Sequence, residues 1–316
     1  MKSIKSAGVI GAGVIGSGWI ARLLLNGIDV FVYDPSKEAP KYVNKVIDNA
    51  ERAYKKLLTS NLPKKGKLLF SGSISEVAKS CELIIEAVPE RLSIKQSAYE
   101  EIESSADKNL VIASSTSGIL PSDLQAKMKH PERLLVAHPF NPVYLLPLVE
   151  IVGGSKTSKN VIEETSKKFT NIGMFPLHIK KEIPAFIADR LLESVWREAL
   201  WLVNDDIATT EEIDDAIRYG FGLRWAQMGL FETYRLAGGE AGMRHFISQF
   251  GPCLEWPWTH LMDVPEFTDE LIEKVSSQSD QQSGQFSIDE LMEKRDDNLV
   301  DFLKVLKDNQ WGAGNS

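Results

Sequence analysis

Near its N-terminus the chain reads Gly11-Ala12-Gly13-Val14-Ile15-Gly16, which has the glycine spacing GxGxxG. A short apolar run at residues 6–10 precedes the glycines, and apolar residues at helical spacing follow them as far as Gly27. A second apolar run then ends in Asp34, eighteen positions after Gly16. This order of strand, glycine turn, helix and strand predicts a dinucleotide-binding unit of the Rossmann type.

The glycines and the acid of this unit have separate physical roles. The first glycine permits the tight turn, the second lets the backbone approach a pyrophosphate, and the third lets the helix pack on the strand. Asp34 can accept hydrogen bonds from an adenosine ribose, and its charge repels a 2′-phosphate, so NAD is predicted rather than NADP. The alternative is a glycine turn without a ligand. The cofactor-binding residues predicted here are Gly11, Gly13, Val14, Ile15, Gly16 and Asp34.

Composition narrows the class of protein. The chain has 316 residues, of which 43% are hydrophobic and 25% charged, as in a soluble globular protein of two domains. Its net charge of -8 argues against binding nucleic acid or an anionic membrane through bulk charge. Cys81 and Cys253 are too few for a disulfide framework or a cysteine zinc site. With no long apolar segment or signal peptide in the sequence, a cytoplasmic protein is expected.

The pattern along the chain predicts an α/β protein with two domains. Apolar runs at residues 83–88, 110–114 and 134–137 are typical of buried parallel strands, and residues 37–67 are predicted to form a helical pair. After residue 180 the pattern changes to long helices, the first with Pro184 in its first turn. We therefore expect a Rossmann-type doubly wound sheet at residues 1–182 and an all-α domain at residues 183–316.

The helical half also contains sequence patterns that mark the start of helices and the position of a loop. Thr209 with Glu212, and Ser287 with Glu290, have the spacing of a capping box. The second pair predicts a last helix that reaches about Leu306. Residues 276–285 are polar and of low complexity, which predicts a loop before that helix.

Polar turns follow the predicted strands, at residues 89–90, 115–117 and 138–141. In an open α/β sheet such turns share one crevice at the carboxyl ends of the strands. One turn carries His138 in a proline-bounded loop, and Glu150 follows twelve residues later. A histidine can take a proton from a hydroxyl near neutral pH, and a buried glutamate on its other nitrogen would fix the tautomer. The alternative for His138 is a satisfied structural residue.

These residues resemble the 3-hydroxyacyl-CoA dehydrogenase family over nearly the whole chain. The shared pieces are the glycine loop, Pro89-Glu90 with Lys95, the run ending at Ser117, the segment His138-Pro139-Phe140-Asn141-Pro142, Glu150, and the segment from Ala185 to Leu192. The resemblance implies that His138 is the base, Glu150 its partner, and Ser117 a hydrogen-bonder to the substrate hydroxyl or carbonyl. It also implies that Glu90 and Lys95 contact NAD, that no metal is needed, and that the helical domain forms a homodimer.

Asp189 departs from the family, which usually has asparagine at this position. A carboxylate there is costly beside a thioester but favourable beside a cation. Segments 222–233, 250–254 and 256–258 are similar to the branch of the family that oxidises L-carnitine, a 3-hydroxy acid with a trimethylammonium group. Ala185 and Ala188 are predicted to share a helical face with Asp189 and to leave space for its methyl groups. The predicted substrate-binding residues are Ser117, Phe140, Asn141, Ala185, Ala188 and Asp189.

For other parts of the substrate site the sequence offers several candidates and does not choose among them. Aromatic faces bind quaternary ammonium groups, so Trp196, Trp201, Trp225, Trp256 and Trp258 are candidates for a cage, although packing is the commoner role of such residues. Candidate partners for a substrate carboxylate are Arg190, Arg224, Arg235 and Lys95. The expected reaction is oxidation of the C3 hydroxyl of L-carnitine to 3-dehydrocarnitine. The alternatives are oxidation of another small 3-hydroxy acid, of the gulonate or 3-hydroxyacyl type, or a crystallin-like NAD-binding protein without catalysis.

Overall fold

The computed structural model describes residues 4–57, 63–237 and 287–310, with isolated positions between 246 and 285. By its internal contacts the chain forms two units, Met1–Asp189 with Asp296–Leu303, and Arg190–Arg295 with Lys304–Asn315. The segments 250–254 and 256–258, including Trp256 and Trp258, lie outside the described residues, as does nearly all of the predicted loop at 276–285.

The first unit is built on one sheet with the strand order β3-β2-β1-β4-β5-β6-β7-β8. Neighbouring strands are parallel except β6 and β7, which are antiparallel. The chain runs outward in both directions from β1, which confirms the predicted doubly wound sheet. The strands are β1 Ser6–Ile10, β2 Asp29–Tyr33, β3 Leu68–Phe70, β4 Leu83–Glu86, β5 Val111–Ser114, β6 Leu134–Pro139, β7 Leu148–Gly153 and β8 Phe175–Ile179.

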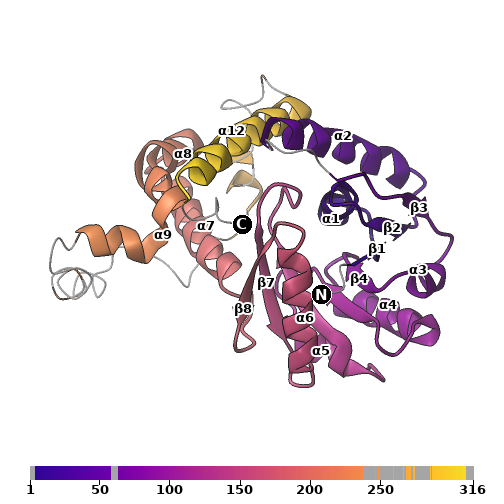
Figure 1. Ribbon diagram of the computed structural model, residues 1–316. Helices are drawn as coiled ribbons and strands as arrows, with labels where there is room; N and C mark the ends of the chain where they lie inside the picture. Colours follow the sequence, from indigo (N-terminus) through magenta and orange to yellow (C-terminus); the bar gives the residue numbers. More distant parts are fainter. Residues whose placement is uncertain are drawn as a thin grey trace. The chain divides into compact units, whose positions relative to one another are not determined.

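Helices cover both faces of this sheet (Figure 1). Side chains of α1, α2 and α6 form the core on one face, and those of α3, α4 and α5 form the core on the other. The described part of segment 37–67 contains one helix, not the predicted pair, and strand β3, which was not predicted, follows this segment directly. The helices are α1 Val14–Leu25, α2 Ala39–Leu57, α3 Ile74–Ser80, α4 Leu92–Ser105, α5 Pro121–Gln125 and α6 Lys159–Thr170, with a short 3-10 turn at Pro131–Arg133.

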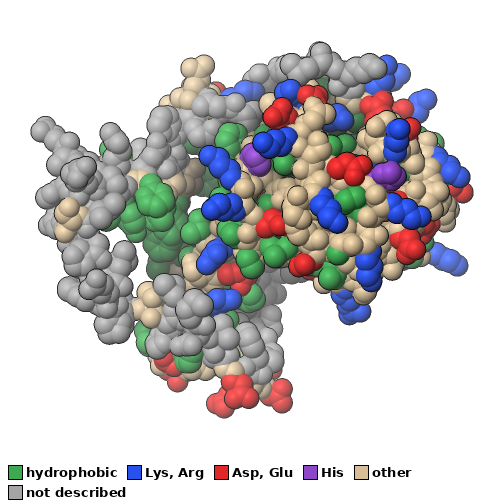
Figure 2. All heavy atoms as spheres, turned by 90° about the horizontal axis from the view of Figure 1, so that it is seen from below, with side chains coloured by type: hydrophobic (Ala, Val, Ile, Leu, Met, Phe, Trp, Pro, Cys, Tyr) green, Lys and Arg blue, Asp and Glu red, His purple; other side chains and the backbone are tan. Residues whose placement is uncertain are grey.

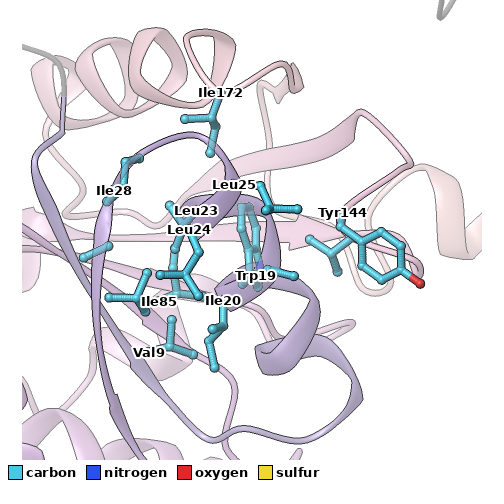
Figure 3. Close-up of a cluster of buried hydrophobic side chains, with 14 of the residues drawn as sticks. Val9, Trp19, Ile20, Leu23, Leu24, Leu25, Ile28, Ile85, Tyr144 and Ile172 are labelled. Carbon is cyan, nitrogen blue, oxygen red and sulfur yellow. The ribbon is translucent and has the colours of Figure 1, made fainter. Parts of the chain in front are cut away.

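Helix α1 is anchored on the sheet by its apolar side chains. Figure 3 shows Trp19, Ile20 and Leu23 packed among Val9 and Ile85 of the sheet, and all five are fully buried. Burial of one such aliphatic side chain contributes about 1.5–3 kcal/mol. The helix therefore holds the glycine turn at its N-terminus in a fixed position.

Arg22 of α1 also fixes the segment that follows the predicted catalytic turn. The residue is 4% exposed, and its guanidinium donates to the carbonyls of Val143, Leu146, Ile172 and Gly173, at 2.7, 3.2, 2.9 and 3.0 Å. Buried carbonyls need such donors, so the chain after the His138 strand is tied to the cofactor-binding helix.

Helix α12, Ile288–Asp308, contributes its middle residues to the first unit. Val300 is fully buried in the core, and the hydroxyl of Tyr144 donates to the buried Asp296. Asp297 pairs with Arg52 and Lys56 of α2, at 2.5 and 2.6 Å. The Ser287 capping box and the last helix are confirmed.

The second unit contains most of α7, Ala188–Asn204, then α8, Thr210–Ala216, a π-helix, Ile217–Phe221, and α9, Gly222–Ala237. The Thr209 capping box is present at the start of α8. Helix α9 is interrupted at Gly229, where φ is +68°. The regular elements among the described residues of this unit are all helices, which agrees with the all-α prediction.

The start of α7 differs from the prediction. The helix begins at Ala188, four residues after Pro184, because Ala185 and Phe186 have left-handed backbone with φ of 59° and 51°. This bend buries Phe186 completely in the core. Left-handed φ at a residue other than glycine costs roughly 1–3 kcal/mol and is found most often at functional sites.

No helix among the described residues is long and apolar enough to cross a membrane. Figure 2 shows one face of the molecule, on which Lys and Arg side chains are interspersed with Asp and Glu side chains. This face therefore offers no uniform basic surface of the kind that nucleic acids bind.

Candidate active site

A cleft of about 730 Å³ lies at the carboxyl ends of β1, β2 and β4. It is lined by the predicted glycine turn, by Asp34 at the end of β2 and by Ala87, Val88 and Pro89 after β4, with α4 on its far side. This is the position at which doubly wound sheets bind nucleotides, next to the strand where the winding reverses.

The glycine turn has the shape that a dinucleotide requires. A Cβ at Gly11, where φ is +90°, would stand 2.4 Å from the Ala87 carbonyl oxygen, and one at Gly16 would stand 1.9 Å from that of Gly11. A Cβ at Gly13 would meet nothing within 4 Å, so this glycine faces open space. Gly13 is also the N-cap of α1, and no side chain caps that helix. Helix N–H groups without a cap suit the pyrophosphate of a dinucleotide.

Asp34 is oriented by the backbone around it. Its Oδ2 accepts from the N–H of Ala12 at 2.7 Å and its Oδ1 from that of Ser36 at 2.8 Å. The carboxylate thus lies between the glycine turn and the end of β2, at the edge of the cleft. A ribose hydroxyl entering this cleft would find a fixed acceptor.

Glu90 holds the turn that carries Ser117. Its Oε1 accepts from the Thr116 hydroxyl, from the N–H of Ser117 at 3.1 Å and from that of Gly118 at 3.4 Å. Burial opposes ionisation of Glu90, but the Thr116 hydroxyl and the Lys95 ammonium outweigh it, so the pKa of this carboxyl lies below its ordinary value. An ionised Glu90 can therefore accept all three hydrogen bonds.

Lys95 is buried rather than open to the cleft. Its side chain is 1% exposed, and its ammonium pairs with Glu86 at 2.8 Å and with Glu90 at 3.2 Å. Tyr99 donates to the other oxygen of Glu86 at 2.5 Å. Burial, and then the Glu86 charge, raise the pKa of Tyr99 well above its ordinary value, so its phenol stays protonated. In this arrangement Lys95 orients Glu90 and is not placed to bind a substrate carboxylate.

His138 and Glu150 face each other across the antiparallel pair β6 and β7. They are register partners, and Nδ1 of His138 is 2.9 Å from Oε2 of Glu150. Opposed residues in such a pair lie on the same face of the sheet, which explains the contact. The predicted loop position of His138 is wrong, because β6 continues through Pro139. Both side chains are nearly buried, at 5% and 0% exposure.

The second oxygen of Glu150 binds the start of α7. Oε1 accepts from the N–H of Ile187 at 3.0 Å and from that of Ala188 at 2.9 Å. A helix N-terminus stabilises such an anion, so Glu150 is held as an acceptor for the Nδ1–H of His138. Ala185 precedes the helix and does not share a helical face with Asp189 as predicted. Ala185 instead lies beside the Ser117 turn. A Cβ added at Gly118 would stand 3.8 Å from the backbone nitrogen of Ala185.

Asp189 reaches the nitrogen of His138 that Glu150 does not bind. Its Oδ2 is 3.5 Å from Nε2, and its side chain is 21% exposed. The rings of Phe140 and Phe186 lie beside the imidazole, with centroids 4.9 and 5.6 Å from it. The imidazole is thus enclosed by two aromatic rings and two carboxylates.

Ser117 and Asn141 are exposed, and neither forms a hydrogen bond with His138 among the described residues. Sequence reasoning missed Phe186, Glu86, Tyr99 and Thr116. The signal for Glu86 was available, since an acid inside an apolar strand needs buried partners. Phe186 gave no signal, because its position depends on the left-handed bend. No group of three or more His, Cys, Asp or Glu that could hold a metal occurs among the described residues.

Two family models match most of the chain. Residues 6–183 match the NAD binding domain of 3-hydroxyacyl-CoA dehydrogenase, and residues 186–265 match its C-terminal domain. A solved structure, 5-formyl-3-hydroxy-2-methylpyridine 4-carboxylic acid 5-dehydrogenase, an NAD+ dependent dismutase, is similar with a TM-score of 0.81 and 27% identity. That likeness covers 96% of this chain and 99% of the other.

Several relatives carry the name L-carnitine dehydrogenase. One from Mesorhizobium japonicum is 58% identical, covering 99% of this chain and 88% of that protein. Another from Pseudomonas putida is 51% identical, covering 98% and 97%. A third, from Ruegeria pomeroyi, is named L-carnitine dehydrogenase/betainyl-CoA thioesterase and is 56% identical, but the chain spans only 64% of its length.

The family models and these relatives confirm the resemblance seen in the sequence. The glycine turn, the cleft beside it and Asp34 fit the dinucleotide that the first model names. The chain belongs to the 3-hydroxyacyl-CoA dehydrogenase family, and its residues 6–183 are an NAD-binding domain.

Proposed function

We propose that this chain oxidises the C3 hydroxyl of L-carnitine to 3-dehydrocarnitine with NAD. The observation that carries this proposal is the imidazole of His138, which has Glu150 on one nitrogen and Asp189 beside the other. The Glu150 carboxylate suits an imidazole that acts as a general base. The Asp189 carboxylate suits a substrate with a positive charge near its hydroxyl. The names of the relatives support the same substrate.

In the proposed reaction His138 removes the hydroxyl proton through Nε2. Glu150 accepts the hydrogen bond from Nδ1 and stabilises the imidazolium that forms. The electron pair of the C3–H bond leaves with its hydrogen as hydride, and the C3–O bond becomes a carbonyl. NAD supplies the hydride acceptor when bound. Ser117 is proposed to donate to the substrate oxygen, on a turn held by Glu90.

The substrate panel that tests this proposal follows NADH absorbance. L-carnitine should be oxidised well, D-carnitine poorly, and 3-hydroxybutyrate, 3-hydroxybutyryl-CoA and gulonate slowly. Better turnover of gulonate or of the CoA thioester would favour another 3-hydroxy acid dehydrogenase. Absence of turnover with every compound, although NAD binds, would favour the crystallin-like alternative.

Asp34 is expected to determine the choice between the two nicotinamide cofactors. Wild-type kcat/KM should be about 10²-fold or more higher with NAD than with NADP, because the carboxylate binds a ribose diol and repels a 2′-phosphate. Asp34→Ala should narrow the ratio of the two kcat/KM values, because it weakens the binding of NAD and improves the binding of NADP. Asp29→Ala is the matched control, since Asp29 lies at the other end of β2 and binds the N–H of Lys67. Equal wild-type efficiency with both cofactors would refute this role.

We also propose a cytoplasmic homodimer that forms through the helical unit and binds neither nucleic acid nor a membrane. On α7 the side chains of Leu191, Leu192 and Trp196 are 57%, 57% and 56% exposed, an apolar surface that a second copy could cover. Sedimentation should give twice the chain mass, and Leu192→Glu with Trp196→Glu should give monomers. A wild-type monomer at all concentrations would contradict the proposal.

A further inference from the structure

The reactive nitrogen of His138 has a competitor beside it. Nε2 must accept the proton of the substrate hydroxyl, yet Oδ2 of Asp189 lies only 3.5 Å from it. A hydroxyl that approaches Nε2 therefore also approaches a carboxylate. Hydrogen bonds to ionised acceptors are roughly twice as strong as those between neutral groups. A 3-hydroxy acid without a cation would donate its hydroxyl to Asp189 rather than to the base.

A cation on the substrate changes this competition. In L-carnitine the ammonium nitrogen is attached to C4, and the hydroxyl is attached to the neighbouring C3. A substrate of this shape can bring its cation to Asp189 and its hydroxyl to Nε2 together, since the two protein atoms are neighbours. The trimethylammonium group has no N–H to donate, so it engages the carboxylate through charge alone.

Among the residues that the structure describes, few other acceptors for the hydroxyl lie beside the imidazole. Phe140 and Phe186 present ring carbons to His138, and the carboxylate of Glu150 is occupied by Nδ1 and by the N–H groups of Ile187 and Ala188. The His138 side chain is 5% exposed, so water reaches this place poorly. Competition between Asp189 and Nε2 is therefore weakly screened.

We propose that Asp189 makes efficient turnover depend on a cation next to the carbinol. It accepts the hydroxyl of substrates that lack such a cation, and it leaves the hydroxyl of substrates that carry one to Nε2. This inference rests on the proposed function, because it assumes that His138 is the base for a 3-hydroxy acid. Asp189 is then a selectivity residue that acts against substrates without a cation as well as for those with one. A carboxylate that only stabilises the first turn of α7 would affect both substrate classes equally.

The first experiment compares L-carnitine with its carbon isostere, 3-hydroxy-5,5-dimethylhexanoate, which keeps the carboxylate but lacks the cation. Asp189→Asn should lower kcat/KM for L-carnitine about 5- to 150-fold and raise it several-fold for the isostere. Asp189→Glu should retain the preference for the cation. Glu211→Gln is the matched control, since it removes an exposed carboxylate from the first turn of α8. A parallel loss with both substrates, or no change with either, would overturn the proposal.

The second experiment supplies the cation separately. Tetramethylammonium chloride should speed wild-type oxidation of 3-hydroxybutyrate at least threefold over sodium chloride of equal ionic strength, and it should not speed the Asp189→Asn variant. Equal rates in the two salts would overturn the proposal. If wild-type protein oxidises L-carnitine but fails this test, only the inference fails. If it does not oxidise L-carnitine at all, the proposed function fails.

Discussion

Replacing His138 by glutamine is expected to lower kcat for L-carnitine by a factor of about 10² to 10⁴, which is the usual contribution of a general base. The glutamine amide can still hydrogen-bond to Glu150, but it cannot take up the hydroxyl proton. The physical reason lies in the geometry of the pair, since the Nδ1 contact of 2.9 Å leaves Nε2 as the nitrogen available to a substrate. Stopped-flow measurement of NADH formation would give the rate of the oxidation step.

The control for this variant is NAD binding. His138 is not among the residues that line the cleft beside the glycine turn, so the affinity for NAD should stay close to that of the wild type. Near-normal turnover of His138→Gln at neutral pH would mean that another group is the base.

Glu150→Gln is expected to lower kcat by about 10² to 10⁴, no more than the loss in His138→Gln. The N–H groups of Ile187 and Ala188 both point at one oxygen of this side chain. They would orient the glutamine with its carbonyl oxygen toward α7 and its amide N–H toward Nδ1. The imidazole must then carry its proton on Nε2, which is the tautomer that cannot act as a base.

A matched control separates this catalytic effect from a loss of stability. Glu103 is also a buried carboxylate that accepts two backbone N–H groups, those of Lys129 and His130 at 2.8 Å each. Glu103→Gln should lower the melting temperature by a similar amount but leave kcat nearly unchanged. If the two variants lose kcat equally, Glu150 acts through folding and not through the tautomer of His138.

The Rossmann unit was predictable because its signals are local. The glycine turn, the apolar runs and Asp34 lie within one short stretch, and each has one dominant physical reason to be there. The capping boxes at Thr209 and Ser287 were predictable for the same reason. The short strand Leu68–Phe70 was missed, since three residues give no period that distinguishes a strand from a loop.

The details of the site depend on contacts between distant residues. Pro139 and Pro142, which follow His138, suggested a loop, but pairing with β7 keeps this segment extended. Pro184 suggested a helix start, whereas the buried Glu150 requires two N–H donors, which the later start at Ala188 provides. The approach of Asp189 to Nε2 could not be predicted, because it results from that displaced start.

The ladder between β6 and β7 has a consequence for how this chain can change in length. His138 meets Glu150 because they are register partners, and the segment between the two strands does not set their separation. Residues inserted near the tip of that connection would leave the pair opposed. A single deletion within β7 ahead of Glu150 would shift the ladder by one and turn the glutamate to the opposite face of the sheet. Between the two strands, a change of length therefore keeps the pair opposed only within the connection, and there it must spare the carbonyls of Val143 and Leu146 that Arg22 binds.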